Sequence, residues 1–244
     1  MDAAASPLTQ ACVLDSRLLA EFARTFEGQK YRHRDQGIGN FIASHLYEDL
    51  FSLGRSTKYT GRVSNATRVV NGPNRVVGRQ GRRGDGTFGE LVPGQSSLAV
   101  DGFAVRRGPI ATLEIGAECK TVGKAMLKQI DRVINDLGGQ ARTFRRQTRD
   151  VIRVAIVGVN FSENYTSYEG NRAYPAQVSP AREAPKVIPL VEKEVRRLYD
   201  ELLILRFKAT NVPPYPFEWV DRNDTYSDYA AALVRLSKLY DERF

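Results

Sequence analysis

Two carboxylates and one ammonium group alternate with apolar residues along residues 113–120 (LEIGAECK). On a strand, side chains alternate between faces, so Glu114, Glu118 and Lys120 would share one face and the apolar residues the other. With Asp101 arriving from a neighbouring strand, such a face can hold Mg²⁺, which prefers hard oxygen ligands and keeps several waters. A metal there would polarise a bound phosphate, and Lys120 would orient an attacking water or stabilise the transition state.

A β-hairpin over residues 97–120 is expected to position these side chains, because Arg106-Arg107-Gly108-Pro109 has turn chemistry between two strand-like runs. Asp101 would lie on the first strand, and Glu118 and Lys120 on the second. The plainer alternative is a solvated sheet face with a cross-strand salt bridge, worth about 0–1 kcal/mol. For Glu114, a second-metal ligand and an exposed edge residue both stay open.

The remaining pattern predicts one α/β domain over residues 1–244, with a mixed β-sheet core flanked by helices. The run VIRVAIVGVN at residues 151–160 is almost wholly apolar and β-branched, so it should be a central strand covered on both faces. A helix before it, ended by Gly138, completes a βαβ unit. The other expected elements are helices at about 15–26, 38–53, 189–199 and 226–240, a strand at 201–210, short strands at 67–70 and 75–78, and loops at 54–94 and 162–185.

The charge of the chain is concentrated in one basic segment. Between Arg55 and Arg83 there are eight Lys or Arg residues and no Asp or Glu, in a chain of net charge +8 and pI about 9.6. A cationic, Gly-rich loop suits contact with a phosphate backbone, although a solvated loop is the alternative. The predicted nucleic-acid contacts are Arg75, Arg79, Arg82, Arg83, Lys124, Arg145 and Arg146.

Several other kinds of site are disfavoured. Two Cys and two His residues match no familiar zinc spacing and are too few for a disulfide framework. The chain has no GxSxG motif and no Walker-type GK[ST] loop. It also has no apolar run of membrane-spanning length and no signal-peptide pattern, so a cytoplasmic protein with no membrane contact is expected.

Asp101, a gap of sixteen residues, and then Glu118-Cys119-Lys120 on an apolar strand followed by a helix and a second apolar strand resemble the PD-(D/E)xK nuclease superfamily, which includes many restriction endonucleases. The resemblance covers roughly residues 37–160 and leaves residues 186–244 as a C-terminal extension. Val100 stands where Pro precedes the acid in the family pattern. The implied fold is a restriction-endonuclease-like mixed sheet.

The implied activity is Mg²⁺-dependent hydrolysis of phosphodiester bonds in DNA, with Mn²⁺ able to substitute. Asp101, Glu118 and Lys120 would be catalytic, and the metal ligands would be Asp101, Glu118 and the backbone carbonyl of Cys119. Two weaker matches are Glu48 as an acidic residue near the metal and Gln129 as a polar residue facing the site. Glu114 is kept as a further candidate metal ligand because of its place on the strand. For Glu48, a plain helix-surface acid is the alternative.

Three functions remain open at this point. The first is a restriction or antiviral defence endonuclease, with a homodimer able to cut both strands. The second is a non-catalytic nucleic-acid-binding module, which the intact acidic and lysine residues argue against. The third is a nuclease effector subunit, DNA- or RNA-directed, that needs a partner protein. Without a separate recognition domain, sequence readout would come from loops such as residues 71–95 or 162–185.

Overall fold

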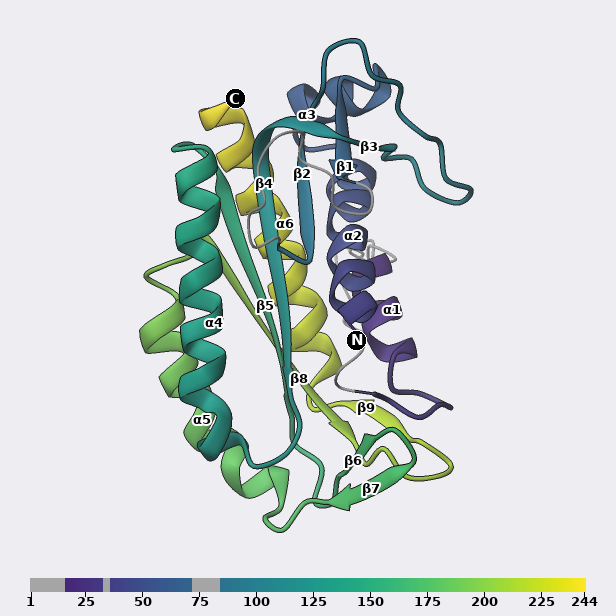
Figure 1. Cartoon of the computed structure of the whole chain (residues 1–244), viewed down its shortest axis with the longest axis vertical. Coiled ribbons are helices and arrows are strands. Elements are labelled where there is room, and N and C mark those ends of the chain that lie inside the picture. Colours follow the sequence, from purple (N-terminus) through teal and green to yellow (C-terminus); the bar gives the residue numbers. More distant parts are fainter. Residues whose placement is uncertain (1–15, 33–35, 72–83) are drawn as a thin grey trace, which may run out of the picture.

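A seven-stranded mixed sheet in the order β3-β1-β2-β4-β5-β8-β9 forms the centre of the computed structural model, which describes residues 16–32, 36–71 and 84–244 (Figure 1). β4, β5 and β8 run parallel, and β2 and β9 pair antiparallel with β4 and β8. The strands are β1 (Arg68–Asn71), β2 (Gly86–Leu91), β3 (Arg107–Gly108), β4 (Ile110–Val122), β5 (Ile152–Asn160), β8 (Glu201–Ala209) and β9 (Phe217–Trp219).

Helices cover both faces of this sheet, so the described residues form one compact α/β domain, as the sequence predicts (Figure 1). Alternate residues of β4 and β5 enter two separate cores, because side chains on a strand point to opposite faces. One face packs α1 (Arg17–Arg24), α2 (Gln36–Leu53), α3 (Thr57–Ser64) and α6 (Arg222–Arg243). The other packs α4 (Met126–Gln147) and α5 (Pro180–Val195).

The predicted strands at 151–160 and 201–210 are confirmed as β5 and β8, and the helix at 38–53 as α2. The predicted stop at Gly138 is wrong, because α4 continues to Gln147. Gln140, Ala141 and Phe144 extend its buried face at helical spacing, and this packing outweighs the roughly 1 kcal/mol that each Gly costs in a helix. The expected loops also contain α3 and a small hairpin of β6 (Thr166–Glu169) and β7 (Arg172–Pro175).

The expected hairpin over residues 97–120 is wrong in its first half. Residues 97–105 form no strand, and β2 is the antiparallel neighbour of β4. Instead, the segment runs outside the sheet edge, where Leu98 bridges to Arg107 of β3. Glu48 fixes it to α2 by accepting hydrogen bonds from the backbone N–H of Ala104 (2.8 Å) and Val105 (2.9 Å).

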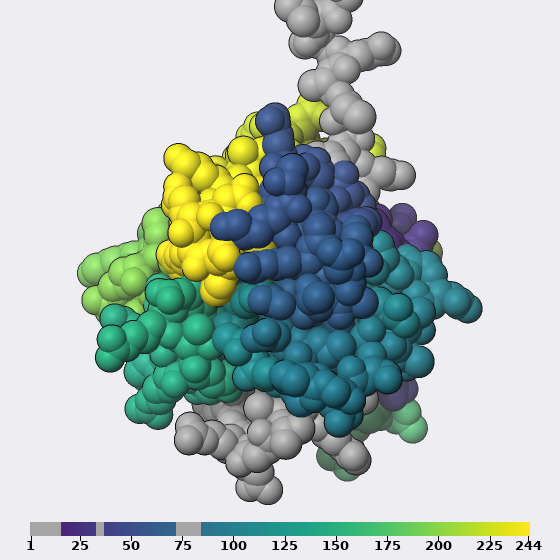
Figure 2. All heavy atoms as spheres, turned by 90° about the horizontal axis from the view of Figure 1, so that it is seen from above, coloured from purple at the N-terminus to yellow at the C-terminus, as the bar shows by residue number. Residues whose placement is uncertain are grey.

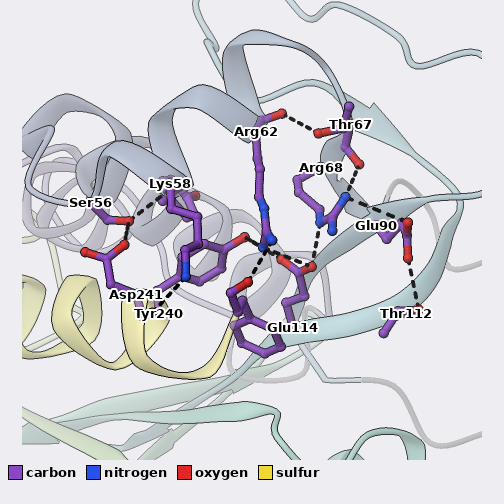
Figure 3. A network of polar contacts seen from close by, with 12 residues as sticks. Ser56, Lys58, Arg62, Thr67, Arg68, Glu90, Thr112, Glu114, Tyr240 and Asp241 are labelled. Carbon is purple, nitrogen blue, oxygen red and sulfur yellow. Dashed lines mark hydrogen bonds and ion pairs between the residues drawn. The ribbon is translucent and has the colours of Figure 1, made fainter.

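A β-bulge in β4 places Glu114 on the opposite face from Glu118. The register between β2 and β4 shifts at Phe88/Gly89, so Gly89 pairs with Leu113 and Phe88 with Ile115, and Glu114 is the extra residue. Its carboxylate, 3% exposed, accepts hydrogen bonds from Arg68 Nε (2.5 Å) and the Tyr240 hydroxyl (2.5 Å) (Figure 3). The predicted shared face of Glu114 and Glu118 is therefore wrong.

The Glu114 network also joins the ends of two helices. Arg62 of α3 lies 3.7 Å from Glu114 Oε1 and donates a hydrogen bond to the Tyr240 hydroxyl of α6. Ser56 and Lys58 donate hydrogen bonds to Asp241 (Figure 3). Seen from this end of the molecule, α3 and the end of α6 lie side by side on the surface (Figure 2). Glu114 is thus a structural residue of this corner.

Candidate metal centre

Asp85 stands just before β2, at the point where β4 loses its neighbour. The pairing with β2 ends at Gly86 opposite Ala117, whereas β4 continues to Val122. Asp85 Oδ2 accepts a hydrogen bond from the backbone N–H of Cys119 at 2.9 Å. The carboxylate also lies against the first turn of α2, where a Cβ on Gly39 would be 2.5 Å from Asp85 Cγ. Asp85 is therefore held against the Glu118-Cys119-Lys120 motif by backbone contacts.

Glu118 and Lys120 share the face of β4 that α4 covers. Lys120 Nζ donates a hydrogen bond to Glu118 Oε1. Glu118 is 6% exposed, and its second oxygen, Oε2, is buried with no hydrogen-bond partner among the described residues. The Lys120 side chain is 29% exposed and so reaches solvent. The pair combines a buried acceptor oxygen with an accessible ammonium group.

Burial and neighbouring charges shift the pKa values of Glu118, Asp85 and Lys120. Burial raises the pKa of Glu118 to about 7, and the charge of Asp85 adds to this, while Lys120 and the backbone N–H of Asp85 offset part of it. Burial also raises the pKa of Asp85 above its ordinary value, despite Lys120 and the N–H of Cys119. Burial opposes the charged form of Lys120, but Glu118 and Asp85 outweigh it and raise its pKa. One ammonium group is thus shared by two crowded carboxylates.

Gln140 of α4 is a further candidate for this site that the sequence did not single out. Phe144 packs on Gly116, where an added Cβ would lie 2.8 Å from the ring. The crossover helix α4 runs antiparallel to β4. From Phe144 back to Gln140 the helix rises about 6 Å, and from Gly116 on to Glu118 the strand rises about 6.6 Å, so the two steps are nearly equal. This register places Gln140 at the level of Glu118. Gln140 is 4% exposed, and its amide Nε2 has no partner in the described part of the chain. A polar residue on the apolar face of an amphipathic helix is the sequence feature that could have pointed to Gln140.

The structure does not bring Asp101 to this site. Asp101 is exposed in the turn beyond β3, and β1 and β2 stand between β3 and β4. Three strand spacings amount to roughly 14 Å. Asp85 instead occupies the place expected for Asp101, because β2 and not residues 97–105 pairs with β4.

The other predicted site residues lie away from this cluster or outside the described residues. Glu48 is 1% exposed and accepts hydrogen bonds from Arg17, Ala104 and Val105, so it belongs to the anchor of residues 97–105. Gln129 is exposed and donates to the Lys124 carbonyl. Of the predicted nucleic-acid contacts, Lys124 precedes α4, and Arg145 and Arg146 are exposed at its far end. Arg75, Arg79, Arg82 and Arg83, with the short strand expected at 75–78, lie outside the described residues.

The donor set fits a hard divalent cation. Asp85 and Glu118 offer carboxylate oxygens, and the Cys119 carbonyl is a further candidate ligand, while waters complete an octahedral Mg²⁺ shell. The orphaned Glu118 Oε2 is the observation that supports this fit. Within residues 16–32, 36–71 and 84–244, no three or more His, Cys, Asp or Glu side chains lie close enough together to hold a metal ion by themselves. Such a site would therefore depend on backbone oxygen, water and substrate.

No protein-family model matches the chain, and no curated protein or solved structure is similar enough to match it. None of the helices that the structure describes is both long and apolar enough to cross a membrane. The function is therefore inferred from the geometry of the site.

Proposed function

We propose that this protein is a metal-dependent endonuclease that hydrolyses phosphodiester bonds in DNA, of the PD-(D/E)xK type, with Asp85 in the role predicted for Asp101. The observation that carries the proposal is the contact of the Asp85 carboxylate with the Cys119 N–H. It joins an acid just before β2 to the Glu118-Cys119-Lys120 motif on the neighbouring β4. Two carboxylates and a lysine then meet at the point where two strands separate.

Each residue has a distinct task in this proposal. Asp85, Glu118 and the Cys119 carbonyl would hold Mg²⁺ or Mn²⁺, which polarises the scissile phosphate and activates water when bound. Lys120, held by Glu118 Oε1 and partly exposed, orients the attacking water or stabilises negative charge on the phosphate. Gln140 offers its buried amide to the Glu118 carboxylate or to a ligand at the same level of α4.

The net charge of +8 supports an anionic substrate. A role in restriction or antiviral defence, as a homodimer or with a partner protein, is part of the same proposal and rests on the resemblance. The cytoplasmic location is proposed from the sequence.

The test is cleavage of supercoiled plasmid with Mg²⁺ and with EDTA, by wild type, Asp85→Asn, Lys120→Ala and Asp101→Asn. Asp101→Asn is the matched control, since it removes the same charge at the position that sequence spacing alone would choose. Loss of one stabilising group should lower the rate by about 10²-fold or more in the first two variants. Asp101→Asn should cut at the wild-type rate.

Two results would contradict the proposal. Loss of cleavage in Asp101→Asn but not in Asp85→Asn would place the site elsewhere. Folded wild type that binds DNA in a salt-dependent way without cutting it would favour a binding module or a subunit that needs a partner.

A further inference from the structure

A small hairpin, β6 (Thr166–Glu169) and β7 (Arg172–Pro175), stands apart from the main sheet. Its two-residue turn has Gly170 first, with φ of 58°, as in type II′ turns, whose twist matches that of the flanking strands. The pairing of Glu169 with Arg172 closes the turn. The local sequence thus builds an ordered projection rather than a loose loop.

The hairpin is fixed beside the segment that follows Lys120. Gly123 packs on the Tyr165 ring, which a Cβ at this position would meet at 2.9 Å. Lys124 Nζ lies 5.2 Å from the centroid of the Tyr174 ring. From the other side, Lys30 Nζ lies 3.8 Å from the Tyr168 centroid. Figure 1 shows the hairpin at the same end of the sheet as the connection from β4 to α4.

The two strands of the hairpin differ in exposure. In β6, Ser167 is buried against the body of the protein, whereas all four residues of β7 are exposed. The outer edge of β7 pairs with no strand in the described part of the chain. The exposed side chains include the Asn171 amide, the Arg172 guanidinium and the Tyr174 ring, 38% exposed. These groups suit hydrogen bonding and stacking rather than burial in an apolar interface.

The surface around the hairpin carries positive charge. Glu183 Oε2 accepts a hydrogen bond from the Met126 N–H at 2.9 Å and so joins the first turns of α4 and α5 at this end. Exposed or half-buried cations here are Lys124, Lys128, Arg172, Arg182 and Lys186, against the exposed carboxylates Asp131, Glu163 and Glu169. The excess of cations is complementary to a phosphate backbone.

We propose that the β6–β7 hairpin is a DNA-binding arm that enters a groove of duplex DNA beside the scissile phosphate, with Arg172 and Tyr174 as its contacting residues. The inference rests on the proposed nuclease function and names its substrate as duplex DNA. A strand of four residues extends about 13 Å, which exceeds the roughly 8.5 Å depth of the major groove, and that groove admits a two-stranded ribbon. The arm therefore has the size and charge to hold a duplex against Lys120.

The experiment uses the full chain and measures both binding to a 30-base-pair duplex and cleavage of plasmid. It compares wild type with the double variant Arg172→Ala/Tyr174→Ala and with Arg197→Ala. Arg197, 70% exposed after α5, is the matched control for loss of a surface arginine at the other end of α5. Single-stranded DNA and duplex RNA of the same sequence serve as competing ligands. Because the substituted side chains are exposed, the melting temperature should stay at the wild-type value.

The double variant should bind the duplex about tenfold more weakly, with the slope of log K against log salt reduced by about one. Arg197→Ala should behave as wild type. Wild type that binds and cuts duplex DNA, with a double variant that does so equally well, would overturn the hairpin proposal alone. A double variant weakened only toward single strands or RNA would overturn the duplex assignment. Wild type that neither binds nor cuts would overturn the proposed function as well.

Discussion

Replacing Glu118 with Gln should stabilise the metal-free protein at alkaline pH, which is the opposite of the usual effect of removing a salt-bridged acid. Burial, with help from Asp85, raises the pKa of Glu118 from 4.5 to about 7. The native state therefore binds a proton more tightly than the unfolded chain between these values. Stability falls as pH rises through this window, and the full loss is present above pH 7.

The size of the effect follows from the same two values. They are 2.5 pH units apart, and at about 1.4 kcal/mol per unit the ionised Glu118 costs about 3 kcal/mol of unfolding free energy at pH 8. This is a ceiling, because Asp85 and Glu118 titrate as a pair and share the effect. Between pH 5 and pH 8, wild type should thus lose about 2–3 kcal/mol more than Glu118→Gln does.

The assay is urea unfolding in EDTA, followed by the fluorescence of Trp219. This is the single Trp of the chain, and it stacks on Phe22 with ring centroids 5.6 Å apart. Glu114→Gln is the control, since Glu114 is equally buried on the same strand but has two arginine partners, and its replacement should destabilise the protein at pH 8. Parallel pH profiles for wild type and Glu118→Gln would refute the reasoning.

Three further predictions concern the scaffold. Gly89→Ala would place a Cβ 1.9 Å from the Thr112 carbonyl oxygen, so it should lower the unfolding free energy by about 2–3 kcal/mol. Gly61→Ala, in a helix with nothing within 4 Å of the new Cβ, should instead raise it by about 0.5–1 kcal/mol in the same urea titration. Burial opposes the charge on Asp200, but hydrogen bonds from Arg243 and Arg153 outweigh it and hold its pKa below 3.8. Asp200→Asn should therefore lower the unfolding free energy at neutral pH, and its difference from wild type should become smaller as pH falls below about 4. A difference that stays constant with pH would show that the arginines do not act through the charge of Asp200.

The elements that could be predicted from the sequence are those whose signal is local. The apolar run of β5 identifies a strand buried on both faces, and β8 combines an apolar run at residues 202–205 with alternating exposed and buried residues at 206–209, which is typical of a strand. The GTFGEL sequence of β2 contains two glycines and has low intrinsic strand propensity. Its pairing with β4 depends on partners far away in the sequence, and so a loop was the better local prediction.

The error over the acidic residue has the same origin. Spacing before Glu118 is compatible with both Asp85 and Asp101, and only the identity of the strand beside β4 decides between them. The prediction that Glu114 shares a face with Glu118 assumed strict alternation of side chains along the strand, and it is wrong because the bulge opposite Gly89 adds one residue to β4. A bulge is set by the partner strand, which local periodicity does not describe. A stronger signal was Asp85 between Gly84 and Gly86, since small neighbours leave room for a carboxylate to approach backbone.

Glu114 and Glu118, four residues apart on one strand, differ in how their buried charge is compensated. Glu114 is surrounded by Arg68, Arg62 and the Tyr240 hydroxyl. Glu118 has Lys120 on one oxygen, and its Oε2 makes no hydrogen bond of good geometry with the described residues, although the backbone N–H of Asp85 lies near enough to the carboxylate to lower its pKa. A buried carboxylate oxygen without a partner destabilises the fold, so a site that only supports structure gains from filling it, as Glu114 does. That contrast, on the same strand and at the same depth, favours Glu118 as a residue kept available for a ligand.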